Sequence, residues 1–406
     1  MRSTLHVEMD HGVLENILKN TDNEKAVQSV LGVEEVVPLT ECVNYKSTFT
    51  RIVVKVVLGN GKTVKKSLIL KNPQTENGAV TEKTLNLFET EIKVNTSLLK
   101  EMGFLMDDFQ DSGGIMWSKL LHHEPCNTLV FEDLEAEGFK HIQWNSTLDA
   151  DHCILVLRTL GKYHGISKVL EGKGVFMKED FNSACHFLTD ENFIKNFFIT
   201  GFQVLKRGIL RYWGLSWDSV AERLKIPEEL LNRRLKEIAE LSETRFNVLN
   251  HGDCWLNNFM FKYDMDSKPY KMRFMNFQRS FYNSPCLDIT FFMYTSIDAT
   301  MRRNHFDRLL KCYYDSLVST LDKYGFRGTK PTYDEISSDM DRVSFFGLCI
   351  FSVYHAVLIA DKKNSSTIDY FYSSEGKPIG VEIYKNKSLI DQMIPDIISF
   401  IQMAGL

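Results

Sequence analysis

The chain has 406 residues, of which 44% are hydrophobic and 25% charged, ordinary values for a globular protein long enough to form two lobes. Its formal net charge is −5 and it has no long run of Lys and Arg, which argues against nucleic acid as the main partner. The eight cysteines form no C-x-x-C pair, so we expect reduced thiols in the core and neither disulfides nor a zinc site.

No segment has the character of a membrane span or an export signal. Residues 1–10 lack the apolar core of a signal peptide. The most apolar window, 344–360, is shorter than the ~20 residues that a membrane span requires, and it contains Ser, Tyr and His. We therefore expect a buried helix at 344–360 and a soluble, cytoplasmic protein.

The first part of the chain changes from helical to strand periodicity. Apolar residues recur at helical spacing within 11–30, which predicts leading helices there. Residues 42–57 are rich in β-branched side chains, and 58–61 have the composition of a hairpin turn. Residues 63–73 then form the expected returning strand of an antiparallel pair.

A lysine and a glutamate follow in an order that is typical of nucleotide-binding lobes. Lys71 lies at the end of the returning strand, and Glu91 lies inside the next helical window. Kinases pair such a lysine with a helical glutamate to position phosphates. The alternative, two ordinary surface charges, is the commoner explanation for any single pair, so the hypothesis depends on the motifs that follow.

A compact strand at 127–134 ends in acidic residues and is the expected crossing between two lobes. We place an N-terminal lobe at 1–133, with leading helices, an antiparallel sheet and one regulatory-type helix, and a helical C-terminal lobe at 134–406. A helix is predicted from about 147, and His164 within it is interpreted as a core histidine. Aromatic residues of 190–245 either line an acceptor pocket or, as we prefer, pack in the core.

The most informative stretch is the loop that begins His-Gly-Asp at 251–253. Strand-like residues lie on both sides of it, and Asn258 follows Asp253 by five positions. Kinase catalytic loops have this spacing: the Asp orients the acceptor hydroxyl and takes its proton, and the Asn holds magnesium. Gly-Asp alone is common in turns, so the signal depends on its context.

The rest of the chain is predicted to contain one more strand and then helices. Residues 270–278 have a strand pattern, and 284–288 lead into a short apolar helix. Beyond residue 300 the periodicity is helical. The expected helices lie around 306–321, 344–360 and 389–403.

The ordered motifs resemble the choline kinase and aminoglycoside phosphotransferase branch of the protein-kinase-like fold. More narrowly, the run H-G-D-x-W-x-N-N-x-M-F-K-Y-D at 251–264, the E-D-L-x-x-x-G-F at 132–139 and the F-Q at 277–278 resemble the ecdysteroid kinase-like (CHK kinase-like) family of insects. The resemblance extends over about residues 30–400. It implies an α+β, two-lobed fold with a small β-rich N-terminal lobe and a large, mainly helical C-terminal lobe.

The resemblance also implies a reaction and the residues that carry it. The γ-phosphoryl group of ATP would be transferred, with Mg²⁺, to a hydroxyl of a small-molecule alcohol such as an ecdysteroid or another sterol. Asp253 would be the base and Asn258 a metal ligand, while Lys71, held by Glu91, would bind the α- and β-phosphates. The further nucleotide-binding residues would be Asn44, Tyr45, Ser47 and the backbone near Glu132 and Leu134. The residues that support the loop would be His251 and Asp288.

Two departures from the family pattern bear on activity. The turn at 42–47 lacks the glycine that usually precedes Asn-Tyr, which makes close backbone approach to phosphate harder. Asn276 stands where the family has a metal-binding aspartate before Phe-Gln, so Asn258 and Asn276 are both neutral, whereas magnesium is normally held by carboxylates.

Three hypotheses therefore stay open. The first is a small-molecule kinase with weak metal binding at Asn276, and the second is a kinase-like binding protein, or pseudokinase, without activity. The third is a globular protein in which the motifs are coincidental, which their order disfavours. The sequence indicates neither the acceptor nor the oligomeric state.

Overall fold

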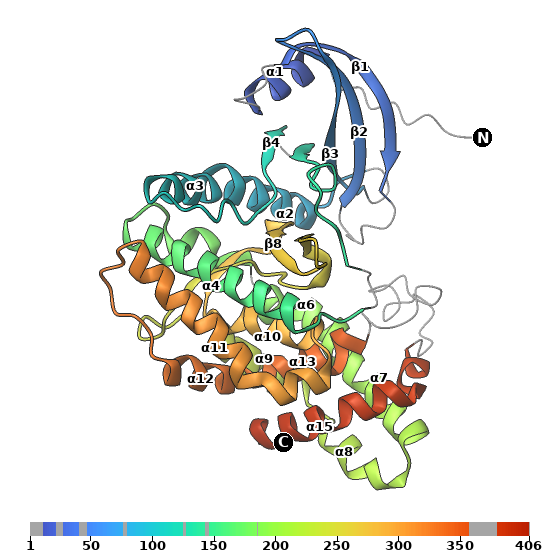
Figure 1. The fold of residues 1–406 in the computed structure, drawn as a ribbon. Helices are drawn as coiled ribbons and strands as arrows, with labels where there is room; N and C mark the ends of the chain where they lie inside the picture. Colours follow the sequence, from blue (N-terminus) through green and yellow to red (C-terminus); the bar gives the residue numbers. More distant parts are fainter. Residues whose placement is uncertain are drawn as a thin grey trace, which may run out of the picture.

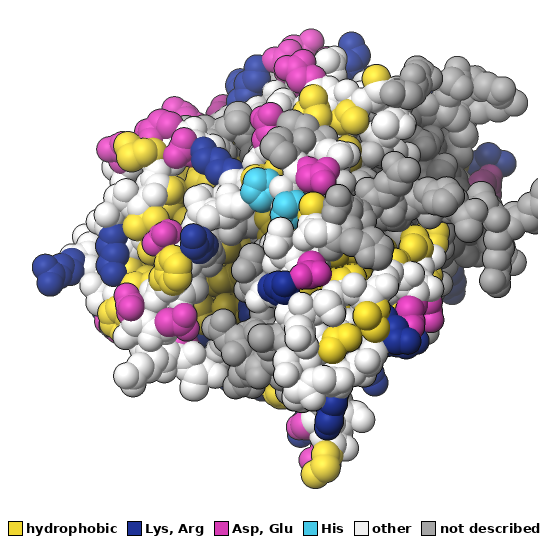
Figure 2. Space-filling view, turned by 90° about the horizontal axis from the view of Figure 1, so that it is seen from above, with side chains coloured by type: hydrophobic (Ala, Val, Ile, Leu, Met, Phe, Trp, Pro, Cys, Tyr) yellow, Lys and Arg dark blue, Asp and Glu magenta, His cyan; other side chains and the backbone are white. Residues whose placement is uncertain are grey.

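The computed structural model describes residues 11–21, 27–39, 47–75, 79–124, 127–142, 146–184, 186–356 and 380–405. An antiparallel sheet with its own helices forms one lobe, and a larger, mainly helical lobe lies below it in Figure 1. The predicted α+β architecture is confirmed. Acidic and basic side chains are interspersed on the face shown in Figure 2, in keeping with the small net charge of −5.

The sheet has the strand order β1-β2-β3-β5-β4, and all its neighbouring strands run antiparallel. The strands are β1 (Val27–Pro38), β2 (Ser47–Leu58), β3 (Thr63–Pro73), β4 (Leu120–His123) and β5 (Leu129–Glu132). Alternate residues of β2, among them Ile52 and Val54, are buried against helix α1 (His11–Thr21). In the central strand β3, Lys71 pairs with Phe49 on one side and Leu129 on the other.

The helix predicted over 11–30 is wrong in its second half. Helix α1 ends at Thr21, and Val27 already belongs to β1, where it pairs with Leu58. The spacing of Val27 and Val30 fits a helix as well as a strand. Pairing with β2 favours the strand, since β2 offers free backbone hydrogen-bonding groups to β1. The β-branched side chains of Val27 and Val30 also pack well on the pleated surface of a sheet.

The helical segment after β3 places Glu91 against the sheet. Helix α2 (Glu82–Lys93) begins at Thr81, whose side chain accepts a hydrogen bond from the Thr84 backbone N–H at 3.3 Å. It continues through the π-helical turn η1 (Val94–Leu98) into α3 (Leu99–Asp108). Helix α2 also contacts the short segment η7 (Phe277–Arg279), which brings the N-terminal lobe to the turn after β8 that contains Asn276.

The C-terminal lobe surrounds two short strand pairs that hold the His-Gly-Asp loop. Strand β6 (Val248–Asn250) pairs with β9 (Phe281–Asn283), and β7 (Phe259–Tyr263) pairs with β8 (Pro269–Phe274). The helices are α4 (Ala150–Gly172), α5 (His186–Thr189), α6 (Glu191–Phe193), α7 (Thr200–Gly208), α8 (Asp218–Arg223), α9 (Glu228–Ala239), α10 (Cys286–Thr295), α11 (Ala299–Lys323), α12 (Tyr333–Arg342), α13 (Ser344–Cys349) and α15 (Lys387–Ala404).

The apolar stretches noted in the sequence are core elements. Helix α13 and the π-helical turn η8 (Ile350–His355) are buried along their whole length. The aromatic residues Phe197, Phe198 and Phe202 also belong to the core of the lobe. Among the described residues, no helix combines the length and the apolar character of a membrane span.

Two glycines let α4 and α11 pack closely. A Cβ atom at Gly161 would lie 2.6 Å from the Tyr313 carbonyl oxygen, and one at Gly165 would lie 2.8 Å from Cγ2 of Thr320. The helices lie side by side in Figure 1. The close approach brings the Tyr313 hydroxyl within 2.9 Å of Nδ1 of His164.

We predict that Gly161→Ala lowers the free energy of unfolding by about 1–3 kcal/mol, because the new methyl group meets backbone that cannot move cheaply. Urea denaturation measures the effect. Gly103→Ala in α3 is the matched control, since the nearest heavy atom to its Cβ is 4.0 Å away. It should leave stability unchanged or raise it by about 0.5–1 kcal/mol. Equal effects at both positions would contradict the packing argument.

Candidate active site

A buried ion pair joins the sheet to helix α2. Lys71 Nζ lies 2.5 Å from Glu91 Oε2, and both side chains are almost completely buried. Burial lowers the pKa of Lys71, while the neighbouring carboxylates of Glu91 and Asp253 raise it. The pair lies on the side of the sheet that faces the His-Gly-Asp loop.

The ammonium group of Lys71 has two further acceptors, both from the segment after β8. It donates to Asn276 Oδ1 at 3.1 Å and to Gln278 Oε1 at 3.1 Å. A lysine ammonium has three hydrogens, so Glu91, Asn276 and Gln278 together satisfy it. Sequence reasoning did not assign a role to Gln278, although the Phe-Gln pair was noted.

A chain of side-chain amides runs from Lys71 to Asp253. Asn276 Nδ2 donates to Asn258 Oδ1 at 2.7 Å, and Asn258 Nδ2 donates to Asp253 Oδ2 at 2.9 Å and to the Asp253 carbonyl oxygen at 2.7 Å. The ends fix the direction: Lys71 can only donate, and the Asp253 carboxylate accepts. Each amide therefore presents its oxygen toward Lys71 and its nitrogen toward Asp253, so both amide oxygens accept hydrogen bonds.

The backbone at Asn276 is left-handed, with φ 63° and ψ 59°. Asparagine and aspartate tolerate this conformation better than other residues that carry a Cβ atom. Just before it, the Met275 N–H donates to the Asn258 carbonyl oxygen at 3.0 Å, which ties the end of β8 to the loop. The turn directs the Asn276 side chain between Lys71 and Asn258.

Asp288 at the start of α10 braces the His-Gly-Asp loop. Its Oδ2 accepts the His251 backbone N–H at 2.6 Å, and its Oδ1 accepts the Gly252 N–H at 2.9 Å. Gly252 has a positive φ of 81°, and a Cβ atom there would lie 1.9 Å from the Arg279 carbonyl oxygen. Only glycine fits this bend, which leads the backbone directly into Asp253.

The tautomer of His251 follows from its two partners. Nε2 donates to the Met275 carbonyl oxygen at 2.8 Å. Nδ1 accepts the Asp253 backbone N–H at 3.2 Å, so it carries no hydrogen. His251 thus links the end of β8 to the loop and holds no position from which it could exchange a proton with substrate.

His164 is a satisfied core histidine, and it also supports the brace. Its Nε2 lies 3.2 Å from Asp288 Oδ2, and its Nδ1 lies 2.9 Å from the Tyr313 hydroxyl. Burial lowers the pKa of His164, which favours a neutral ring that donates to Asp288 and accepts from Tyr313. Tyr313 lies on α11, 149 positions away, and nothing in the sequence pattern pointed to it.

At the start of β2, Ser47 is buried and its hydroxyl oxygen has no hydrogen-bond partner among the described residues. An unpartnered buried hydroxyl suits a position that a ligand completes. Asn44 and Tyr45 lie outside the described residues.

Glu132 is the last residue of strand β5, and Leu134 lies in the turn that follows it. Glu132 lies opposite Leu68 in the sheet, and burial raises the pKa of its carboxyl group. Leu134 is buried, and its carbonyl oxygen accepts the Phe139 N–H at 2.9 Å.

Between Glu132 and Leu134, Asp133 fastens the crossing to the sheet. It accepts hydrogen bonds from Arg51 Nε and Ser67 Oγ, each at 2.6 Å. Arg51 also bonds Glu135 at 2.6 Å. Sequence reasoning missed Arg51 and Asp133, because 82 positions separate them.

The donor set does not fit a magnesium ion well. Asn258 and Asn276 offer neutral oxygens that are already hydrogen-bonded, and Asp253 is the one carboxylate in the amide chain. Within the described ranges, no group of three or more His, Cys, Asp or Glu side chains is arranged to hold a metal ion. Mg²⁺ prefers one or two carboxylates together with phosphate oxygens.

The two-lobed fold, the buried lysine–glutamate pair and the braced His-Gly-Asp loop define a kinase-like protein. The chain belongs to the ecdysteroid kinase-like family, whose model matches residues 41–326, more than half of its length. The resemblance predicted from the motifs is thereby confirmed.

Two other comparisons add less. The solved structure of a microcompartment-associated aminopropanol kinase is similar with a TM-score of 0.35 and 11% identity, covering 84% of this chain and 96% of that chain. No curated protein matches the chain.

We predict that Asp288→Asn lowers the free energy of unfolding by about 1–3 kcal/mol, because an amide offers one acceptor oxygen and turns its NH₂ group toward a backbone N–H. Urea denaturation measures the loss. Asp298→Asn is the matched control: Asp298 Oδ1 alone accepts two backbone N–H groups at the start of α11. Asparagine keeps that oxygen and caps helices as well as aspartate, so stability should hold. A loss at both positions would show that charge, and not the second acceptor, matters.

Proposed function

We propose that the chain binds ATP and transfers its γ-phosphoryl group to a hydroxyl of a small molecule, such as an ecdysteroid or another sterol-like alcohol. The observation that carries this proposal is the hydrogen-bonded chain from Lys71 to Asp253. Two amide side chains separate Lys71, a cation that can bind phosphates, from Asp253, a carboxylate that can accept the proton of an alcohol. Membership of the ecdysteroid kinase-like family supports phosphotransfer to a small molecule.

In this proposal Lys71 binds the α- and β-phosphates. Phosphate oxygens replace the neutral oxygens of Asn276 and Gln278 on its ammonium group, while Glu91 keeps its place. The exchange is favourable because hydrogen bonds between two charged groups are about twice as strong as bonds to a neutral partner. It also releases the oxygen of Asn276.

Asp253 orients the acceptor and takes its proton. Asn258 holds Oδ2, while Oδ1 has no hydrogen-bond donor among the described residues and is left for the hydroxyl. Asp288 and His251 hold the loop backbone in the position from which Asp253 reaches the acceptor. Asn258 and Asn276 would be the side-chain ligands of a divalent ion, and weak ones, because their oxygens are neutral.

The rest of the proposed nucleotide site follows the sheet. Ser47 and the turn with Asn44 and Tyr45 would cover the phosphates, and the backbone near Glu132 and Leu134 would contact adenine. The lobe boundary at 133/134 then passes through the adenine site.

A second candidate function is nucleotide binding without turnover. The specific observation in its favour is Asn276, whose oxygen is bonded to Lys71 and which adds no charge to attract a metal ion. A pseudokinase of this kind would still bind ATP through Lys71.

We predict that Asn276→Asp raises the affinity for ATP in the presence of magnesium by about tenfold or more, because a carboxylate ligand replaces a neutral one. Thermal-shift titration with ATP, with and without magnesium, measures the change. Asn276→Gly is the control, since it tolerates the left-handed backbone and frees Lys71 without adding charge. Because it also removes a neutral ligand oxygen, it should not raise the affinity for ATP in the presence of magnesium. No difference between Asn276→Asp and the unmodified protein would remove Asn276 from the metal position.

We predict that Asp253→Ala abolishes phosphotransfer from ATP to a sterol alcohol while ATP still binds, because Lys71 and Glu91 remain in place. Product formation with radiolabelled ATP measures turnover, and a thermal shift with ATP measures binding. Asp266→Ala, an exposed position in the turn between β7 and β8, should change neither. Unchanged turnover in Asp253→Ala would exclude Asp253 as the base. No turnover in the unmodified protein, with ATP bound, would favour the pseudokinase.

A further inference from the structure

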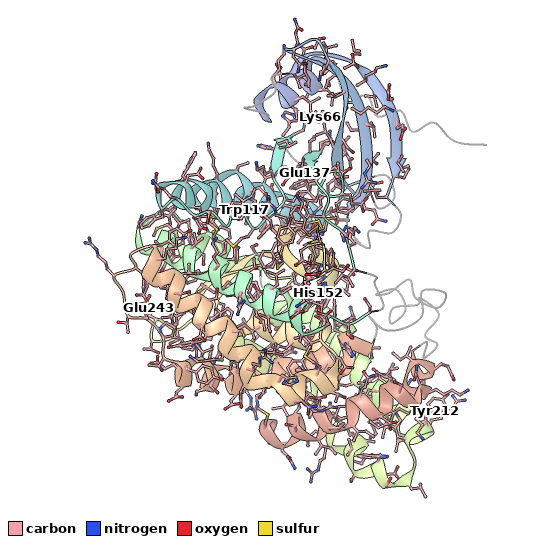
Figure 3. The ribbon with its side chains drawn as sticks, viewed as in Figure 1. Lys66, Trp117, Glu137, His152, Tyr212 and Glu243 are labelled. Atoms are coloured by element: carbon pink, nitrogen blue, oxygen red, sulfur yellow. The ribbon has the colours of Figure 1, made fainter. Side chains whose placement is uncertain are left out.

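A large cavity lies on the C-terminal lobe, away from the proposed nucleotide site. Its volume is about 1380 Å³. The wall combines the last turn of α4, residues 243–246 before β6, residues 324–331 after α11, and α12. Figure 3 shows Glu243, on the rim, at the edge of the lobe and apart from His152 at the start of α4. None of the residues of the proposed nucleotide site lines this cavity.

Acidic residues of the wall are mostly engaged by neighbours. The engaged groups are Glu171 with Lys168 at 2.7 Å, Glu243 with Lys178, Asp339 with Arg342 at 2.5 Å, and Glu335 in the cap of α12. Asp334 has no ion pair with a described residue. On the basic side, Lys173, Arg245 and Arg327 form no ion pair with a described residue, although the nearby carboxylates of Asp339 and Glu240 act to raise the pKa of Arg245. Unpaired positive charge therefore exceeds unpaired negative charge in the cavity wall.

Arg245 and Arg342 lie near each other in the cavity wall, and each has an N–H group without an acceptor among the described residues. Arg245 Nη2 donates to the Glu240 carbonyl oxygen at 2.6 Å, and Arg342 donates to Asp339 at 2.5 Å and to the Ile238 carbonyl oxygen at 3.2 Å. Arg245 Nε and Arg342 Nη2 are buried and lack an acceptor among the described residues. After burial, the nearby Arg342 is the main cause that lowers the pKa of Arg245. Like charges with unsatisfied donors are a costly arrangement. Asp339, which is bonded to Arg342, and Glu240 offset part of this cost, and an anion bound beside the two guanidinium groups would offset more.

The cavity also offers apolar surface next to these cations. Phe246 and Phe326 are partly exposed and line it. Lys168 Nζ lies 5.5 Å from the centre of the Phe246 ring, and the rings of Phe109 and Tyr324 contact each other at a tilt of 55° with centres 5.1 Å apart. Flat aromatic walls beside a cation suit a ligand with a planar apolar body and an anionic head.

We propose that this cavity binds a small organic anion, with its oxyanion group held by Arg245 and Arg342 and its ring system packed on Phe246 and Phe326. The head group is a carboxylate, phosphate or sulfonate, since each accepts paired hydrogen bonds from guanidinium groups. Because the unpartnered Nε of Arg245 and Nη2 of Arg342 are buried, the guanidinium group of Arg245 or Arg342 turns to meet the anion. The proposal does not depend on the phosphotransfer reaction.

The test uses the full chain and 1-anilinonaphthalene-8-sulfonate, a fluorescent sulfonate with two ring systems. We expect saturable binding at one site that excess ATP does not displace. Arg245→Gln should weaken this binding by roughly fivefold or more, because a charge-assisted hydrogen bond is lost. N-phenyl-1-naphthylamine has the same rings without the sulfonate, so its binding should be weaker and insensitive to Arg245→Gln.

Two further variants test whether the effect is specific to the cavity. Arg327→Gln changes an exposed cation of the cavity rim and should weaken sulfonate binding without affecting folding. Arg308→Gln, an exposed arginine of α11 outside the cavity, should have no effect. The proposal is overturned if Arg245→Gln and Arg327→Gln bind the sulfonate as the unmodified protein does, if ATP displaces it, or if the neutral probe binds equally well.

Discussion

The buried ion pair between Lys71 and Glu91 is the interaction on which the site depends. Taking an ammonium and a carboxylate out of water costs several kcal/mol per ion, and their mutual attraction offsets this only when the remaining donors are satisfied. Here Asn276 and Gln278 complete the hydrogen bonding of the lysine. The segment after β8 is thereby tied to the N-terminal sheet, and residues of both lobes bond to one ammonium group.

The charges of this arrangement explain why an amide is stable at position 276. Lys71 and Arg279 bring two positive charges to this region, Glu91 and Asp253 bring two negative charges, and Asn276 adds none. A carboxylate there would add a third negative charge, which a bound cation would balance but an empty site would not. Asparagine therefore suits the site without a metal ion, whereas aspartate would suit the metal-bound site of the proposed kinase.

Several residues of the site could be predicted from the sequence, because the motifs that contain them follow one another in a characteristic order along the chain. Lys71, Glu91, Asp253 and Asn258 were each located by their place between predicted strands and helices. The direction of the amide chain was not predictable, since it depends on which atom of Asn276 faces Lys71. Contacts between distant positions, such as Arg51 with Asp133, leave no local pattern. The prediction that the helical region extends to residue 30 was wrong, because residues 27–30 pair with β2, a contact that the local spacing of apolar residues does not reveal.

The close packing of α4 against α11 has a consequence for the order of folding. His164 lies 149 positions from Tyr313 and 124 positions from Asp288, so its contacts close two very long loops of chain. Loop closure of that length is slow, and contacts of this kind form late. The brace on the His-Gly-Asp loop is therefore complete only when α4, α10 and α11 have come together. A chain released before α11 is made would contain every residue from Lys71 to Asp288, yet His164 beside Asp288 would lack its tyrosine partner.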